Sequence, residues 1–177
     1  MRHYLLTTSE IRRLAIALGC RPSRTVRITD QAPMLALMRE NIALNLLEDS
    51  VAASILDWGS SSPSSSQLQE HPPVPGSSPS PSCSTSSGYT YPDVILAADC
   101  VYFEPAFPLL QQTLRDLIGP NTICHFCFKK RRRADLHFMT KVKKHFVVEE
   151  VADDPDRDAY ARENIFLYTI RAKDERR

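Results

Sequence analysis

The stretch DVILAADCVYFEPAFPLL, residues 93–110, decides the fold of this chain. It begins with a continuous apolar run, which is typical of a strand buried within a parallel sheet. The strand is expected to end at Ala98 and to release Asp99, Tyr102 and Glu104 into a loop. Ligands of open α/β sheets bind beyond the carboxyl ends of the strands. These polar side chains are therefore candidate site residues, suited to holding an ammonium group.

Strands and helices alternate on both sides of this stretch. Apolar and β-branched runs predict strands, and apolar residues spaced three and four apart predict helices. The expected strands are residues 25–29, 51–56, 93–98, 122–128, 146–151 and 165–170, and the expected helices are 33–47, 105–117 and 133–144. The expected inward residues are Met34, Leu37, Met38, Ile42 and Leu46, then Phe107, Leu110, Leu114 and Leu117, then Leu136, Met139 and Val142. The order predicts an α/β layered fold with a mostly parallel sheet and an antiparallel last strand.

A Ser- and Pro-rich segment at residues 59–88, without aromatic residues, interrupts this alternation. Such a composition cannot bury enough apolar surface to offset its ordering entropy. We expect one domain in two parts, residues 1–58 and 91–173, separated by a disordered insertion at 59–90. The insertion is either a tolerated loop expansion or a phosphorylation target.

The composition favours a cytoplasmic protein, which we expect to be monomeric. The 177 residues suit one domain, and the formal net charge of +1 indicates no particular partner. No apolar run approaches the roughly 20 residues of a membrane span, and charges interrupt the apolar N-terminal stretch, unlike in a signal peptide. Five scattered cysteines favour a reducing compartment.

Two further residues stand where expected strands end. Asp30 closes the run RITD, where a carboxylate can accept hydrogen bonds from both hydroxyls of a ribose. An aspartate near a helix start is also common for structural reasons. Trp58, the single tryptophan, follows the second strand and could stack on an adenine ring or simply pack in the core.

The order of these segments resembles a known family. The runs RITD (27–30), MLALMRENIALN (34–45), LDWG (56–59) and the 93–110 stretch are similar to seven-strand, S-adenosylmethionine-dependent protein-lysine methyltransferases of the family-16 type. The tail, residues 128–151 and 162–173, looks closer to the fungal branch that methylates translation elongation factor 1-alpha. The resemblance implies a Rossmann-like seven-strand methyltransferase sheet, S-adenosyl-L-methionine as cofactor and this elongation factor as protein substrate.

The resemblance also implies roles for individual residues. Asp30 would bind the cofactor ribose, Trp58 would lie against the adenine end, and Ala98 would contact the cofactor through its backbone. Asp99 and Tyr102 match the Asp-x-x-Tyr motif at the methyl-transfer site of the family. These residues would make the chain a protein-lysine N-methyltransferase.

One feature of the family is missing from this chain. Members carry a first strand and a loop of the type Glu-x-Gly-x-Gly-x-Gly, but here Tyr4 takes the acidic position, and Leu6, Thr8, Glu10 and Arg13 take glycine positions. We expect residues 3–7 to supply a substitute central strand, and the chain to be N-terminally truncated by a wrong start site or exon. The alternative function is a degenerate, non-catalytic methyltransferase fold that binds a partner.

Two other sequence patterns could indicate a metal site and a nucleic-acid site, but neither interpretation is favoured. Cys124 and Cys127 form a C-x-x-C within an expected strand, without further ligands nearby, so we expect no metal site. The run KKRRR, residues 129–133, could bind nucleic acid, but no aromatic platform accompanies it. A solvated helix start explains that run better, so nucleic acid is not expected as a partner.

Overall fold

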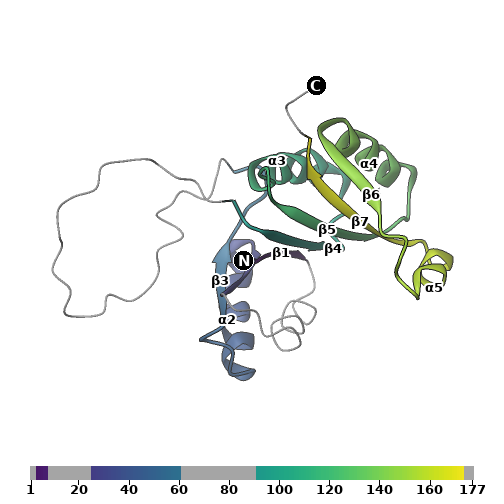
Figure 1. Cartoon of the computed structure of the whole chain (residues 1–177). Coiled ribbons are helices and arrows are strands. Elements are labelled where there is room, and N and C mark those ends of the chain that lie inside the picture. The colour runs from purple at the N-terminus through teal and green to yellow at the C-terminus, as the bar shows by residue number, and fades with distance from the viewer. Residues whose placement is uncertain (1–2, 8–24, 61–90, 174–177) are drawn as a thin grey trace, which may run out of the picture.

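The computed structural model describes residues 3–7, 25–60 and 91–173, and for residues 3–7 it describes the backbone. The strands are β1 (His3–Thr7), β2 (Val26–Asp30), β3 (Val51–Ile55), β4 (Val94–Ala98), β5 (Ile123–Lys129), β6 (Phe146–Glu150) and β7 (Ile165–Ala172) (Figure 1). The helices are α2 (Leu35–Leu44), α3 (Phe107–Leu117), α4 (Arg133–His145) and α5 (Arg157–Arg162). Two 3-10 turns, η1 (Ala32–Met34) and η3 (Glu104–Ala106), lead directly into α2 and α3. No helix of these ranges is long and apolar enough to cross a membrane.

The described strands form one seven-stranded sheet in the order β3-β2-β1-β4-β5-β7-β6. The pairs from β3 to β5 are parallel, and β7 runs antiparallel to both of its neighbours, β5 and β6. This arrangement confirms the predicted mostly parallel sheet with an antiparallel last strand.

Strand β1 occupies the centre of the sheet, as expected for a substitute strand. His3 pairs with Val26 of β2 on one side and with Val94 of β4 on the other. Its backbone groups supply the hydrogen bonds that both neighbours need, whatever its side chains are. The side chains of Tyr4 and Leu6 and the whole of Thr8, Glu10 and Arg13 lie outside the described residues.

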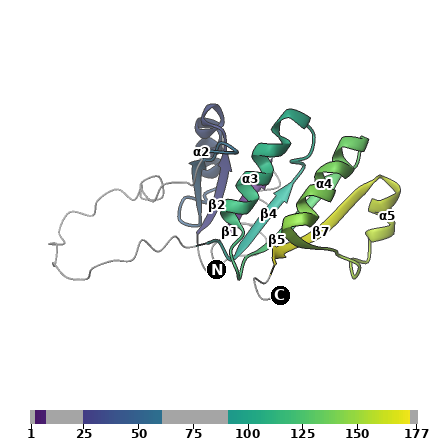
Figure 2. The ribbon, with the colours of Figure 1, turned by 90° about the horizontal axis from the view of Figure 1, so that it is seen from above.

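Helices cover both faces of the sheet. Alternate residues of a strand point to opposite faces. Leu96 of β4 packs with the core below α2, whereas Ile95 and Ala97 pack with the core below α3 and α4. Figure 1 accordingly shows α3 and α4 on one side of the sheet and α2 on the other, and Figure 2 shows α3 and α4 running next to each other along the sheet.

The larger core confirms the predicted inward face of α3. Its four expected apolar residues are all buried: Phe107, Leu110, Leu114 and Leu117. An aromatic cluster joins this helix to its neighbours, because the ring of Phe138 on α4 lies 5.1 Å from that of Phe107 and 5.9 Å from that of Phe126 on β5. Together these contacts hold α3 and α4 firmly over the strand ends that carry the candidate site.

Three predicted inward residues are wrong. Leu136, Leu37 and Leu46 are 44%, 44% and 85% exposed, so they do not belong to the core. In α4 the buried position is taken by Phe138 instead of Leu136. Helix α2 ends at Leu44, so Leu46 lies beyond it. A helical stripe wider than the contact it makes leaves its outer apolar residues in water, so spacing alone overestimates the buried face.

Helix α5 was not predicted. Its sequence, RDAYAR, has six residues and contributes no buried residue to the core. A helix without an apolar stripe has no periodic signal, so the sequence pattern does not reveal it.

Candidate active site

A pocket of about 490 Å³ opens at the carboxyl ends of β2 and β3, beside the loop that follows β4. It brings together three of the predicted site residues, Asp30, Trp58 and Tyr102. Ala98 and Asp99 are not among its lining residues. The complete lining is Thr29, Asp30, Gln31, Leu56, Asp57, Trp58, Tyr102, Phe103, Pro105, Ala106 and Leu109.

Asp30 is the last residue of β2 and faces this pocket. Its backbone carbonyl accepts a hydrogen bond of 2.9 Å from the N–H of Leu56, which ties the ends of β2 and β3 together. Its carboxylate Oδ1 accepts a bond of 2.8 Å from the N–H of Gln31. The local backbone therefore fixes the carboxylate at the rim, where it can accept further hydrogen bonds from a ligand.

Trp58 lies between the core and the pocket. Its half-buried side chain packs against the larger core and also lines the pocket. The next residue, Gly59, has a positive φ of 79°, and its N–H donates to Oγ1 of the buried Thr113 at 3.0 Å. The turn after β3 is thus fastened to α3, which places the indole ring between core and pocket. Residues 61–90 of the expected insertion lie outside the described residues. Gly59, the first residue of that expected insertion, belongs to this turn.

Substituting Gly59 with alanine is expected to lower the free energy of unfolding by about 2 kcal/mol. A Cβ at this position would lie 2.6 Å from Cδ2 of Leu109, and the positive φ is strained for alanine. Thermal unfolding should show the transition lowered by roughly 4–8 °C. The double variant Gly59→Ala/Leu109→Ala should recover part of the loss, since it relieves the clash but not the backbone strain. An unchanged transition in Gly59→Ala would contradict this account.

Asp99 lies just outside the pocket, in a left-handed backbone conformation with φ of 55°. Its N–H donates to the carbonyl of Cys127 at 3.0 Å, so β4 and β5 stay joined where β4 ends. Oδ1 of its carboxylate lies 3.1 Å from Nη2 of Arg131. Ala98 immediately before it pairs with Thr7 of β1 and with Cys127 of β5, which sets its backbone at the end of the central strand.

Exposed aromatic side chains form the outer wall of the pocket. Tyr102 is 50% exposed and Phe103 is 56% exposed, and both line the cavity. Large exposed aromatics beside a cavity are characteristic of binding sites. Glu104, the third polar residue of the predicted loop, starts the η3 turn and does not line the pocket.

Sequence reasoning missed much of the lining, including Thr29, Gln31, Leu56, Asp57, Pro105, Ala106 and Leu109. Each follows or precedes a strand end or the start of α3. The rule that strand ends converge on one edge could have found Asp57, which stands beside Trp58. No pattern of spacing reveals Leu109, because it points from α3 across to the turn after β3.

The two patterns set aside earlier have structural roles. In the run KKRRR the guanidinium groups of Arg131 and Arg132 bind other parts of the chain, Asp99 and the carbonyl of Tyr102. Burial raises the pKa of the Cys124 thiol, and the nearby Cys100 raises it further. A thiol with a raised pKa stays protonated, so Cys124 packs as an apolar side chain.

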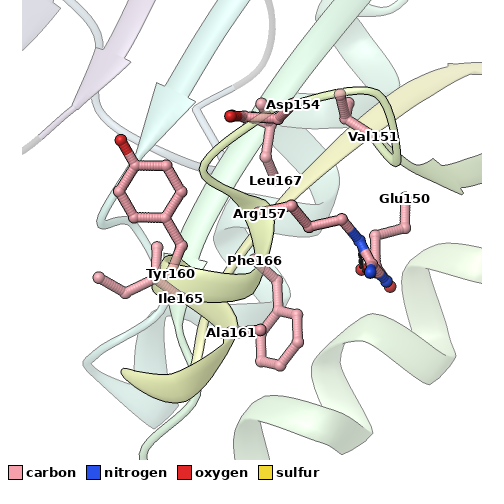
Figure 3. A pocket seen from close by; sticks show the side chains of 9 residues that line it. All are labelled: Glu150, Val151, Asp154, Arg157, Tyr160, Ala161, Ile165, Phe166 and Leu167. Atoms are coloured by element: carbon pink, nitrogen blue, oxygen red, sulfur yellow. Dashed lines mark hydrogen bonds and ion pairs between the residues drawn. The ribbon is translucent and has the colours of Figure 1, made fainter.

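A second, much smaller cavity lies between β6, α5 and β7, and Figure 3 shows its lining. Its volume of about 20 Å³ suits a single water molecule. Arg157 points toward Glu150 there and donates twice to the same carboxylate oxygen, at 3.0 and 2.7 Å (Figure 3). The cavity is too small for a substrate, and the ion pair holds α5 onto the sheet.

Two solved structures share the fold of this chain. An O-methyltransferase family protein from Burkholderia thailandensis has a TM-score of 0.61 at 14% identity, covering 98% of this chain and 52% of that one. The N-terminal domain of human METTL16, in complex with SAH, has a TM-score of 0.56 at 12% identity, covering 98% of this chain and 62% of that one. Such low identity shows the fold alone, which is the Rossmann-like fold predicted from the sequence.

Proteins similar in sequence to this chain are named protein-lysine methyltransferases. Protein-lysine N-methyltransferase EFM6 of Saccharomyces cerevisiae is 36% identical over 148 residues, which cover 82% of this chain and 54% of that protein. Protein N-lysine methyltransferase METTL21A of Danio rerio is 32% identical over 138 residues, or 76% of this chain and 53% of that protein. The chain thus spans about half the length of the curated relatives it matches. Because a family described as lysine methyltransferase also matches residues 11–72 and 84–145, the chain belongs to the lysine methyltransferase family.

Proposed function

We propose that the protein is an S-adenosylmethionine-dependent protein-lysine N-methyltransferase that acts as a cytosolic monomer. The observation that carries this proposal is the pocket at the carboxyl edge of the sheet. There Asp30 and Trp58 come from two neighbouring strand ends and meet Tyr102, which belongs to the Asp-x-x-Tyr motif. Family membership supplies the reaction class, and the pocket supplies side chains suited to it.

The residues of the pocket fit the nucleoside part of the cofactor. The volume of about 490 Å³ is within the range of small-molecule sites. The Asp30 carboxylate is an acceptor for the ribose hydroxyls, and the Trp58 indole offers a flat apolar surface for adenine. When bound, S-adenosylmethionine supplies an activated methyl group and leaves as the thioether. We propose that the backbone at Ala98, at the end of β4, contacts the cofactor beside this group.

The other side of the pocket suits the amine of a substrate lysine. Only a neutral amine attacks, although the free lysine pKa is about 10.4. The rings of Tyr102 and Phe103 can exclude water from the side chain, and desolvation lowers the pKa of an amine. In this proposal the carboxylate of Asp99, just outside the pocket, accepts a hydrogen bond from the nitrogen and directs its lone pair. Aromatic walls also tolerate the cationic methylated product.

Translation elongation factor 1-alpha is the substrate that we propose. A relative named EEF1A lysine methyltransferase 3, from Mus musculus, is 41% identical over 66 residues, which is 36% of this chain. The resemblance of the tail to the fungal elongation-factor branch supports the same substrate. A cytosolic location follows, because that substrate is a translation factor.

The direct test is methyl transfer to the purified elongation factor. This chain, S-adenosylmethionine and elongation factor 1-alpha are incubated together, and intact mass spectrometry should show additions of single methyl groups. Fragmentation should then assign them to lysine. An excess of S-adenosylhomocysteine is the control and should suppress the product. Absence of any methylated lysine would contradict the proposal and favour the non-catalytic, partner-binding alternative.

A further inference from the structure

We propose that Arg131 and Arg132 are positioning residues that hold the loop 99–103 in the geometry needed for methyl transfer. This inference rests on the proposed function, since the loop carries the Asp-x-x-Tyr motif. The two arginines lie in the adjacent loop 130–132, which follows β5 as the loop 99–103 follows β4. Two neighbouring strand ends are thereby tied together on the side of the pocket where Tyr102 stands.

The first tie holds Asp99. This residue leaves β4 through a left-handed conformation with φ of 55°, which aspartate tolerates better than most residues but does not prefer. Nη2 of Arg131 donates to its Oδ1 at 3.1 Å. The guanidinium thus constrains the direction of the carboxylate.

The second tie holds the backbone at Tyr102. Nη2 of Arg132 donates to the carbonyl oxygen of Tyr102 at 2.5 Å. Half of the Tyr102 side chain is exposed, so packing alone constrains it weakly. A bond to its carbonyl therefore constrains the backbone from which the ring projects into the lining of the pocket.

The arginines can act as ties because their own loop is anchored. Oδ2 of Asp135, which is fully buried, accepts hydrogen bonds from the backbone N–H of Arg131 at 2.8 Å and of Arg132 at 2.9 Å. The N–H of Lys130 donates to the carbonyl of Asn164 at 2.7 Å, just before β7. Hydrogen bonds to a buried carboxylate are strong, so the arginine backbones provide a rigid base.

This arrangement predicts a large effect on catalysis with a small effect on stability. Both side chains of the Arg131–Asp99 pair are 41% exposed, and exposed ion pairs contribute little to the folded state. A misplacement of about 1 Å near reacting atoms can reduce a rate by roughly 100-fold. If the arginines had only a structural role, their loss would lower stability more than it lowers kcat.

The experiment compares Arg131→Ala and Arg132→Ala with the matched control Arg133→Ala, an exposed arginine next in sequence. Hydrogen–deuterium exchange is measured on peptides that contain residues 99–103, together with kcat, the KM for S-adenosylmethionine and the affinity for S-adenosylhomocysteine. We expect faster exchange in this segment, kcat lowered about 10- to 100-fold, and KM and affinity within about twofold of the wild type. Arg131→Lys should recover part of kcat, because it keeps a cation near Asp99. Arg133→Ala should behave as the wild type.

Unchanged exchange in the segment 99–103 would overturn the inference, whatever happens to the rate. Faster exchange with unchanged kcat would also overturn it, because the loop would then be held without consequence for transfer. If the wild type transfers no methyl group, exchange still decides whether the arginines position the loop. In that case the proposed function alone would fail.

Discussion

Replacing Asp30 with alanine is expected to weaken the binding of S-adenosylhomocysteine at least about 100-fold. The carboxylate would accept two hydrogen bonds from the ribose, and hydrogen bonds to a charged group contribute about 1.5–3 kcal/mol each. Losing about 3 kcal/mol corresponds to somewhat more than 100-fold in affinity. Calorimetric titration of the whole chain measures the change directly. Fluorescence gives an independent readout, because Trp58 is the single tryptophan and lines the same pocket.

The matched control for this experiment is Asp49→Ala. Asp49 is an exposed acidic residue, whereas Asp30 is half-buried; Asp49 precedes β3 and so lies at the opposite end of the strands from the pocket. This variant should bind S-adenosylhomocysteine as the wild type does, which separates a specific contact from a change in net charge. Equal binding by Asp30→Ala and the wild type would remove Asp30 from the site. Equal weakening in both variants would point to a general electrostatic effect.

Replacing Asp99 with asparagine is expected to lower kcat for lysine methylation at least about 100-fold while leaving cofactor affinity within about threefold. Asparagine keeps the shape of the side chain and tolerates the left-handed backbone found at this position. The substitution therefore removes the negative charge with little strain. The carboxylate does not line the pocket, so binding of the nucleoside should be spared. Transfer of a labelled methyl group to elongation factor 1-alpha, under single-turnover conditions, measures the rate of the chemical step.

Tyr102→Phe is the companion to this variant. It keeps the aromatic wall and removes the hydroxyl, so a small change in rate would assign the role of Tyr102 to its ring. A loss as large as that of Asp99→Asn would assign the role to the hydroxyl. A wild-type rate in Asp99→Asn, with a folded and cofactor-binding protein, would contradict the place of Asp99 in the transfer site.

The sequence by itself determined the layered architecture. The apolar run at residues 93–98 and the β-branched run at 25–29 correspond to β4 and β2, because burial on both faces leaves a local signal in each strand. The inward face of α3 was equally legible from its spacing. Asp30, Trp58 and Tyr102 could be selected as candidate site residues, since strand ends and a family motif mark them locally.

Only the tertiary structure decided which of these residues share a pocket and what holds them there. Asp30, Trp58 and Tyr102 line one cavity, whereas Asp99 stands outside it with its carboxylate on Arg131. The partners Arg131 and Asp99 are 32 positions apart. From the run KKRRR we predicted a solvated surface, because composition gives the charge of the arginines but not the residues that they bind. Such pairings depend on the parallel alignment of β4 and β5, which brings the ends of distant segments to one edge of the sheet. No local sequence pattern predicts which residues come into contact there.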